Sequence, residues 1–139
     1  MGMGTLPFDF AFEDHPLAPL TLYNVGGPAR LALAPRTVEE AAAAYEWMRG
    51  QPGRKLILGG GSNILICDGG FDGIVLLTDG LDRLEVLGDD RYRAEAGVEL
   101  DRLVREVMLE NNYDGVGGLS GIPGSVGGAI FMNAGTVNG

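Results

Sequence analysis

Apolar and polar residues alternate along the first half of the chain in a way that predicts strand, helix and strand. Residues 29–34 form the first expected strand, and residues 55–58 form a short buried one. Between them, residues 38–48 are rich in strong helix formers. Thr37 and Glu40 make a capping box at the start of this helix, because the threonine oxygen can accept from first-turn amides.

The second half shows a different pattern. Three further strands are expected, over residues 74–77, 84–87 and 92–96. Turns bearing Asp and Gly separate them, and this spacing is typical of an antiparallel set. A helix is then expected over residues 100–111, with Leu103, Val104 and Val107 on its apolar face. The whole pattern predicts an α+β fold.

We expect a leader over residues 1–16, a first subdomain over 17–72 and an incomplete second subdomain over 73–139. A chain of 139 residues is long enough to bury a core without a disulfide or a metal. Its one cysteine, Cys67, is interpreted as structural, in a reducing compartment or one where redox state does not matter. No charged and apolar leader or membrane span is evident, so we expect a cytoplasmic protein.

The net charge of the chain limits which ligands and partners it is expected to bind. Ten Lys and Arg against nineteen Asp and Glu give a net charge of −9, which argues against nucleic acid or an anionic membrane as partner. An anionic ligand would therefore be held by backbone amides. The acidic residues look like turn residues, and no metal site is predicted; they include Asp79, Asp82, Asp89 and Asp90.

Glycine is unusually frequent, with 24 residues in the chain, and one glycine cluster directly follows the strand at 55–58. The cluster consists of Gly59, Gly60, Gly61, Ser62 and Asn63. Glycines there would let the backbone approach a diphosphate and present its amides to it. A tight structural turn is an equally good interpretation. Neither the dinucleotide fingerprint, which would need a small residue at Ile64, nor the phosphate loop fits this cluster.

A second glycine-rich segment spans residues 117–135. Its candidate site residues are Gly121, Ile122, Pro123, Gly124, Ser125, Gly127, Gly128, Asn133 and Gly135. Pro123 suits the first turn of a helix, whose bare start would admit a flat or phosphorylated ligand. Close packing of this helix on a sheet would explain the same small residues.

The two segments together, in this order, resemble the UDP-N-acetylenolpyruvoylglucosamine reductase family. Residues 21–29 (TLYNVGGPA) look like the opening segment of that family, and residues 58–63 with 68–73 (DGGFDG) look like its first flavin loop. Residues 121–135 look like its second flavin loop. One departure follows Gly135, where the family often has an aromatic residue and this chain has Thr136 and Val137.

The resemblance implies an FAD-binding domain of the vanillyl-alcohol oxidase-like type, with two α+β subdomains, truncated at its C-terminus. It implies that residues 59–63 hold the diphosphate of FAD. Residues 121–125, 127 and 128 would line the flavin, with Asn133 and Gly135 nearby. No covalent link to flavin through His15 or Cys67 is expected.

The reaction that the resemblance implies is an NADPH-dependent reduction of a UDP-sugar enolpyruvyl ether to UDP-N-acetylmuramate, for the bacterial cell wall. FAD would carry the hydride. Catalytic residues are expected beyond Gly139, together with a substrate-binding domain, so none is assigned here. The isolated chain is expected to bind FAD weakly or not at all and to turn nothing over.

Two alternatives stay open. One is a non-catalytic flavin or nucleotide-binding module that a partner chain completes. The other is an oxidase or dehydrogenase from the wider flavin superfamily, which the sequence of residues 122–125 disfavours. The uncovered half-site of glycine and aliphatic residues also predicts self-association, because apolar surface would face water.

Overall fold

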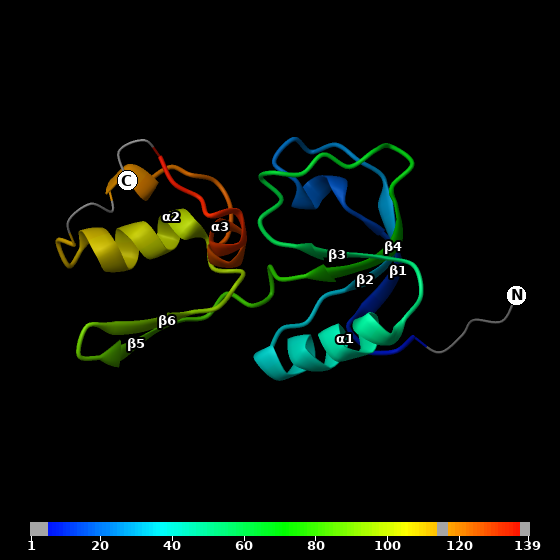
Figure 1. Cartoon of the computed structure of the whole chain (residues 1–139), viewed down its shortest axis with the longest axis horizontal. Helices are drawn as coiled ribbons and strands as arrows, with labels where there is room; N and C mark the ends of the chain where they lie inside the picture. Colours follow the sequence, from blue (N-terminus) through cyan, green and yellow to red (C-terminus); the bar gives the residue numbers. More distant parts are fainter. Residues whose placement is uncertain (1–5, 114–116, 137–139) are drawn as a thin grey trace, which may run out of the picture.

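The computed structural model describes residues 6–113 and 117–136, and its first half is a four-stranded sheet (Figure 1). The strands are β1 (Ala11–Pro16), β2 (Pro28–Leu33), β3 (Arg54–Leu58) and β4 (Phe71–Leu77). Their order across the sheet is β1-β2-β4-β3. β4 runs parallel to both of its neighbours, whereas β1 pairs antiparallel with β2.

The position of β4 corrects our expectation of an antiparallel set beginning at residue 74. Its last four residues, Ile74, Val75, Leu76 and Leu77, are all buried because both faces of a central strand are covered. Such an uninterrupted apolar run is typical of parallel strands buried on both sides. The run itself was the signal for a central position.

The two faces of the sheet carry separate cores. Helix α1 (Val38–Gly50) covers one face, where Ala44 and Met48 pack with Ile74 and Leu76. The opposite face is covered by the loops that follow β1 and β3, through a cluster that includes Leu17, Ile66, Val75 and Leu77. Figure 1 shows α1 on one side of the sheet and the loops on the other. Because both faces of the sheet are covered in this way, the second glycine segment approaches the sheet at the ends of its strands.

The cap of α1 confirms the helix start that was expected at Thr37. The Thr37 hydroxyl oxygen accepts from the Glu40 amide at 3.1 Å. The Glu40 carboxylate accepts in turn from the amide of Arg36 at 2.7 Å, one residue before the position that a capping box would use. Both bonds satisfy amides near a helix end, which lacks intrahelical acceptors.

The second half contains a hairpin and several helical segments. β5 (Leu84–Gly88) pairs antiparallel with β6 (Arg91–Ala94), as expected for this part of the antiparallel set. The expected helix appears as α2 (Leu100–Leu103) and a π-helical continuation, η2 (Val104–Leu109), and buries Val104 and Val107. Short 3-10 turns lie at η1 (Ala18–Leu20) and η3 (Gly117–Leu119). The last helix is α3 (Val126–Met132).

The expected subdomain limits fall inside the sheet. Residues 11–16, which we placed in a leader, form β1 because they pair with β2 and bury Ala11. Residue 73, the expected start of the second subdomain, lies within β4. The division of the chain into two FAD-binding subdomains stays a prediction.

The mixture of helices and sheets confirms the α+β class. In Figure 1, α3 stands between the sheet and the half formed by β5, β6 and α2. Over residues 6–113 and 117–136, no helix has the length and apolar character that crossing a bilayer requires.

Candidate functional site

A cavity of about 360 Å³ lies where the loop after β3 meets the segment that leads into α3. Both glycine segments contribute to its wall, although they lie far apart in the sequence. The first contributes Gly59, Gly60, Gly61, Ser62 and Asn63, and the second contributes Ile122, Pro123, Gly124, Ser125 and Gly128. Its volume falls in the range of small-molecule sites, which is about 300 to 1,000 Å³.

Ser125 joins the two segments. Its side-chain oxygen accepts from the Gly60 amide at 3.2 Å, across 65 positions in the sequence. The same oxygen caps α3 by accepting from the Gly128 amide at 3.3 Å. Ser125 is only 3% exposed, so both amides share a buried acceptor. The start of α3 is therefore fixed relative to the end of β3.

Glycine is required in the first segment because other parts of the chain lie so close, namely the second segment at Gly59 and Gly60 and Leu20 at Gly61. A Cβ atom added at Gly60 would lie 2.8 Å from Gly124 Cα, and one at Gly59 would lie 2.8 Å from Ser125 Oγ. A Cβ at Gly61 would overlap the Leu20 carbonyl oxygen, and Gly61 has a φ of +63°. Close packing thus accounts for these glycines, as the structural interpretation of the sequence proposed.

Beyond Gly60, the loop keeps backbone donors available. Within the described part of the chain, no protein acceptor takes the amides of Gly61, Ser62 or Asn63. All of these residues line the cavity, and the Ser62 hydroxyl and Asn63 carboxamide add further polar groups. Successive backbone amides that face one concavity are a known way to bind an anion, and these amides belong to residues that line the cavity. The residues present therefore fit the diphosphate of a dinucleotide such as FAD.

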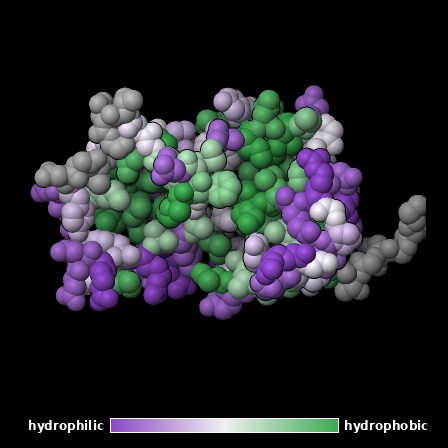
Figure 2. Space-filling model, in the orientation of Figure 1, coloured by the Kyte–Doolittle hydropathy of each residue, from purple (hydrophilic) through white to green (hydrophobic). Residues whose placement is uncertain are grey.

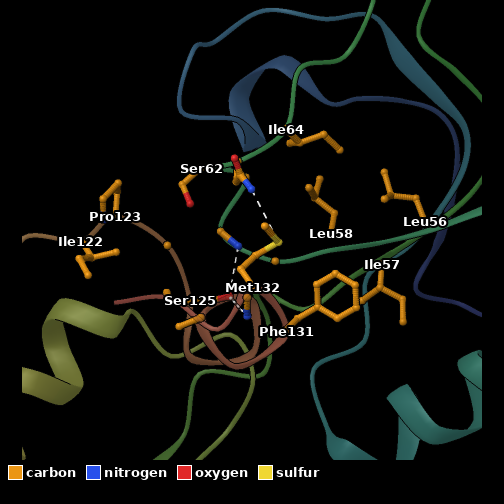
Figure 3. A pocket seen from close by; sticks show the side chains of 18 residues that line it. Leu56, Ile57, Leu58, Ser62, Ile64, Ile122, Pro123, Ser125, Phe131 and Met132 are labelled. Atoms are coloured by element: carbon orange, nitrogen blue, oxygen red, sulfur yellow. Dashed lines mark hydrogen bonds between the residues drawn. The ribbon is translucent and has the colours of Figure 1, made fainter. Parts of the chain in front are cut away.

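Apolar side chains outside our list of candidate residues complete the wall. They are Leu56, Ile57, Leu58, Ile64, Ala129, Phe131, Met132 and Ala134. Phe131 lies beside Ile57, and Ile122 and Pro123 lie across the cavity from them (Figure 3). Phe131 is 88% exposed and Ile57 is 53% exposed. Such a wall could cover the apolar face of a flat ring, and Figure 2 shows apolar residues gathered in the middle of this face of the molecule.

No local signal could have identified Ile57 and Phe131 as neighbours, since they come from β3 and α3. Their placement at one cavity depends on how these two elements meet. Met132 is placed in a similar way, because the Asn63 side-chain amide lies 3.6 Å from its sulfur. This interaction brings the end of α3 to the first glycine segment.

The second glycine segment is held along residues 96–100 by backbone hydrogen bonds. The Leu100 amide donates to Gly124, the Val126 amide to Val98, and the Gly127 amide to Ala96, at 2.9, 2.8 and 2.9 Å respectively. A Cβ at Gly127 would lie 2.9 Å from Ala96 Cβ. Gly127 therefore packs against this extended segment.

Four candidate residues lie outside the cavity wall. Gly127 contacts Ala96, and Asn133 ends α3 in the left-handed conformation with a φ of 49°. Gly121 has a φ of +79° and donates its amide to Asp101, while Gly135 is exposed. The expected helix start at Pro123 is also corrected. Ser125 is the N-cap and the helix begins at Val126, because the Ser125 oxygen supplies the acceptor for the first turn.

Asp101, in the first turn of α2, reaches the residues just before the cavity wall. Its Oδ1 accepts from the Gly121 amide at 3.1 Å and from the Ser120 hydroxyl at 3.4 Å. Its other oxygen pairs with Arg105 at 2.7 Å. The hydrogen bond from Gly121, followed by the charge of Arg105, lowers the pKa of Asp101 below its ordinary value of 3.8.

A second cavity of about 700 Å³ shares part of this wall. Both cavities are lined by Gly60, Ile122, Pro123, Gly124 and Ser125. The second is also lined by acidic groups that include Asp79, Asp82, Glu99 and Asp101. The junction of the two glycine segments therefore separates a mainly apolar hollow from an acidic one.

Comparisons with known proteins show what this chain is similar to. UDP-N-acetylenolpyruvoylglucosamine reductase of Treponema denticola is 38% identical over 123 residues, which cover 86% of this chain and 38% of the relative. The enzyme of the same name from Clostridium tetani is 40% identical over 119 residues, covering 86% of this chain and 38% of the relative. The enzyme of that name from Carboxydothermus hydrogenoformans is 37% identical over 123 residues, which cover 88% of this chain and 40% of the relative.

The chain thus spans 38 to 40% of the length of these relatives. A family model described as an FAD binding domain matches residues 29–139, which include both glycine segments and the whole cavity wall. By this match over most of its length, the chain belongs to the FAD binding domain family.

Proposed function

We propose that this chain is the FAD-binding part of an NADPH-dependent UDP-N-acetylenolpyruvoylglucosamine reductase. The observation that carries the proposal is the cavity in which the two glycine segments meet, where the amides of Gly61, Ser62 and Asn63 have no acceptor among the residues that the structure describes. The similarity to reductases over most of the chain supports it. The parent reaction would convert UDP-N-acetylglucosamine enolpyruvate to UDP-N-acetylmuramate in the synthesis of peptidoglycan precursors.

In this proposal, the loop after β3 holds the diphosphate. A chain with a net charge of −9 repels anions at long range, so local donors must supply the attraction. Backbone amides do so without a basic side chain, and a charge-assisted hydrogen bond contributes about 1.5 to 3 kcal/mol. The Ser62 hydroxyl and Asn63 carboxamide would add directed bonds. The Gly60 amide would take no part, since Ser125 already accepts from it.

The second segment would line the flavin and keep water from it. Ile122 and Pro123 on one side, and Ile57 and Phe131 on the other, provide apolar surface for a planar ring (Figure 3). Gly124 and Gly128 leave room beside that ring because they lack side chains. Bound FAD would supply hydride transfer, and the residues named here would orient it. The candidate residues outside the cavity wall would support it, and these are Gly121, Gly127, Asn133 and Gly135.

The remaining steps of the reaction are assigned to the part of the relatives that this chain does not span. We therefore propose no catalytic residue among residues 1–139. Binding of NADPH and of the UDP-sugar belongs to the parent enzyme in this proposal, which places it in the cytoplasm. We also propose that the chain comprises two subdomains, with the cavity between them.

FAD titration of the purified chain tests the cofactor proposal. Flavin fluorescence should change in a saturable way on binding, and ADP should compete because it carries the same diphosphate. Adenosine, which lacks the diphosphate, is the matched control and should compete poorly. Equal competition by adenosine and ADP would contradict the assignment of the loop after β3.

A second assay tests the assignment of catalysis. The chain, FAD, NADPH and the UDP-enolpyruvyl sugar are mixed, and NADPH absorbance is followed. We expect no oxidation that depends on the sugar. Sugar-dependent turnover by this chain would show that residues 1–139 contain the catalytic groups.

A further inference from the structure

The turn formed by Ser120 and Gly121 leads directly into the cavity wall at Ile122 and Pro123. Side-chain contacts tie this turn to α2 through one carboxylate. Asp101 Oδ1 accepts from the Gly121 amide at 3.1 Å and from the Ser120 hydroxyl at 3.4 Å. The position of the turn relative to α2 therefore depends on an acceptor at Asp101.

Packing gives Gly121 little support of its own. A Cβ added there would meet no atom within 4 Å, and its φ of +79° suits a residue without a side chain. Residues further along are held differently, since Gly124, Val126 and Gly127 form backbone hydrogen bonds with residues 96–100. Ile122 and Pro123 lie between these bonds and the Asp101 contact. Their position is thus set from both ends.

We propose that Asp101 is a positioning residue for the bound cofactor, which holds the Ser120–Gly121 turn so that Ile122 and Pro123 keep their place in the cavity wall. The inference rests on the proposed binding of FAD. It gives the carboxylate no contact with the reacting atoms. Ile122 and Pro123 belong to the wall shared by both cavities, so a displaced turn would change the shape of each.

Two substitutions in the full chain separate the acceptor from the charge. Asp101→Ser suits the first turn of a helix but is too short to reach Gly121. Asp101→Asn keeps an oxygen acceptor at the same reach and removes the charge. The matched control is Arg105→Ala, which removes the 2.7 Å ion pair of Asp101 and leaves both acceptor contacts in place.

The experiment measures FAD affinity by fluorescence titration and the exchange rate of the Gly121 amide by NMR. Asp101→Ser should weaken FAD binding by about tenfold, the loss expected for a hydrogen bond to a charged acceptor, and should speed exchange at Gly121. Asp101→Asn should restore most of both quantities. Arg105→Ala should stay within about threefold of the wild type in affinity, as for an exposed ion pair.

Each other outcome rejects a specific statement. Equal FAD affinity in the wild type and Asp101→Ser overturns the positioning role and leaves the proposed function intact. An Asp101→Asn variant as weak as Asp101→Ser shows that charge matters rather than the acceptor, which also overturns it. A wild-type chain for which ADP and adenosine compete equally with FAD rejects the proposed function, and with it the role of Asp101 toward the cofactor.

Discussion

The Ser125 hydroxyl oxygen accepts from the amide of Gly60 at 3.2 Å while it caps α3 through Gly128. One buried atom thus makes a local bond within its own helix end and a long-range bond to the loop after β3. The long-range bond decides which amides of that loop stay available. It removes the Gly60 donor and leaves those of Gly61, Ser62 and Asn63.

Replacement of Ser125 by Ala should lower the free energy of unfolding by about 2 kcal/mol, since a helix cap and a buried bond are each worth about 1 kcal/mol. Chemical denaturation followed by circular dichroism measures this. Thr37→Ala is the matched control, because Thr37 caps α1 with the same geometry and forms no long-range side-chain bond within residues 6–113 and 117–136. It should cost about 1 kcal/mol. Equal losses in the two variants would show that the bond to Gly60 contributes nothing to stability.

Gly60→Ala should be destabilising by about 1 to 3 kcal/mol, the usual cost of overpacking. The added methyl group would lie 2.8 Å from Gly124 Cα and 2.9 Å from the Ser125 nitrogen, and neither backbone can move without opening the junction. FAD affinity should fall as well. Gly69→Ala is the control, because a Cβ there meets no atom within 4 Å.

Thermal denaturation and FAD titration of the two glycine variants provide the check. Gly69→Ala should stay within about 0.5 kcal/mol of the wild type. A Gly60→Ala protein as stable as Gly69→Ala would mean that the two segments do not meet as closely as described.

Local features of the sequence predicted local structure well. Thr37, Glu40 and the helix formers that follow specify α1 within a few residues, and the helix formed as expected. The antiparallel pairing that we expected for β4 was wrong. The order and direction of the strands in a sheet depend on which strands meet, and turns that bear Gly and Asp do not encode that. The buried run of Ile74, Val75, Leu76 and Leu77 did encode a central position.

The candidate site shows the same division. Both glycine segments were identified from composition and order, and the structure brings them together at one cavity. Ile57, Phe131 and Met132 line the same cavity but were not among our candidate residues, since an exposed apolar residue on a strand or helix carries no sign of its neighbours. Pro123 was assigned to a helix because proline favours the first turn, yet the Ser125 cap moved the start to Val126.

The contribution of Asp101 to the free energy of unfolding should change with pH in the acidic range. Its pKa is lowered in the folded chain, so the unfolded chain binds its proton more readily. That contribution is therefore present above the ordinary value of 3.8 and is lost as the pH falls through the folded pKa. The difference in unfolding free energy between the wild type and Asp101→Asn should be largest near neutral pH and shrink below about pH 4. Urea denaturation of both proteins over this range would measure it, and a difference that grows on acidification would contradict the sign of the shift.

The outer face of α3 should make the isolated chain self-associate. Ile130 is 77% exposed and Phe131 is 88% exposed, and Ile57 continues the apolar surface onto β3. Burial of one such side chain contributes about 1.5 to 3 kcal/mol, so Ile130→Ser should raise the dissociation constant of a dimer by about tenfold or more. Sedimentation equilibrium at several concentrations measures this constant.

Val86→Ser is the control, because Val86 is 75% exposed on β5 and lines none of the described cavities. Saturating FAD should reduce association, since the cofactor would cover Ile57 and Phe131. A monomer at every concentration, with and without FAD, would show that this surface does not drive contact between copies of the chain.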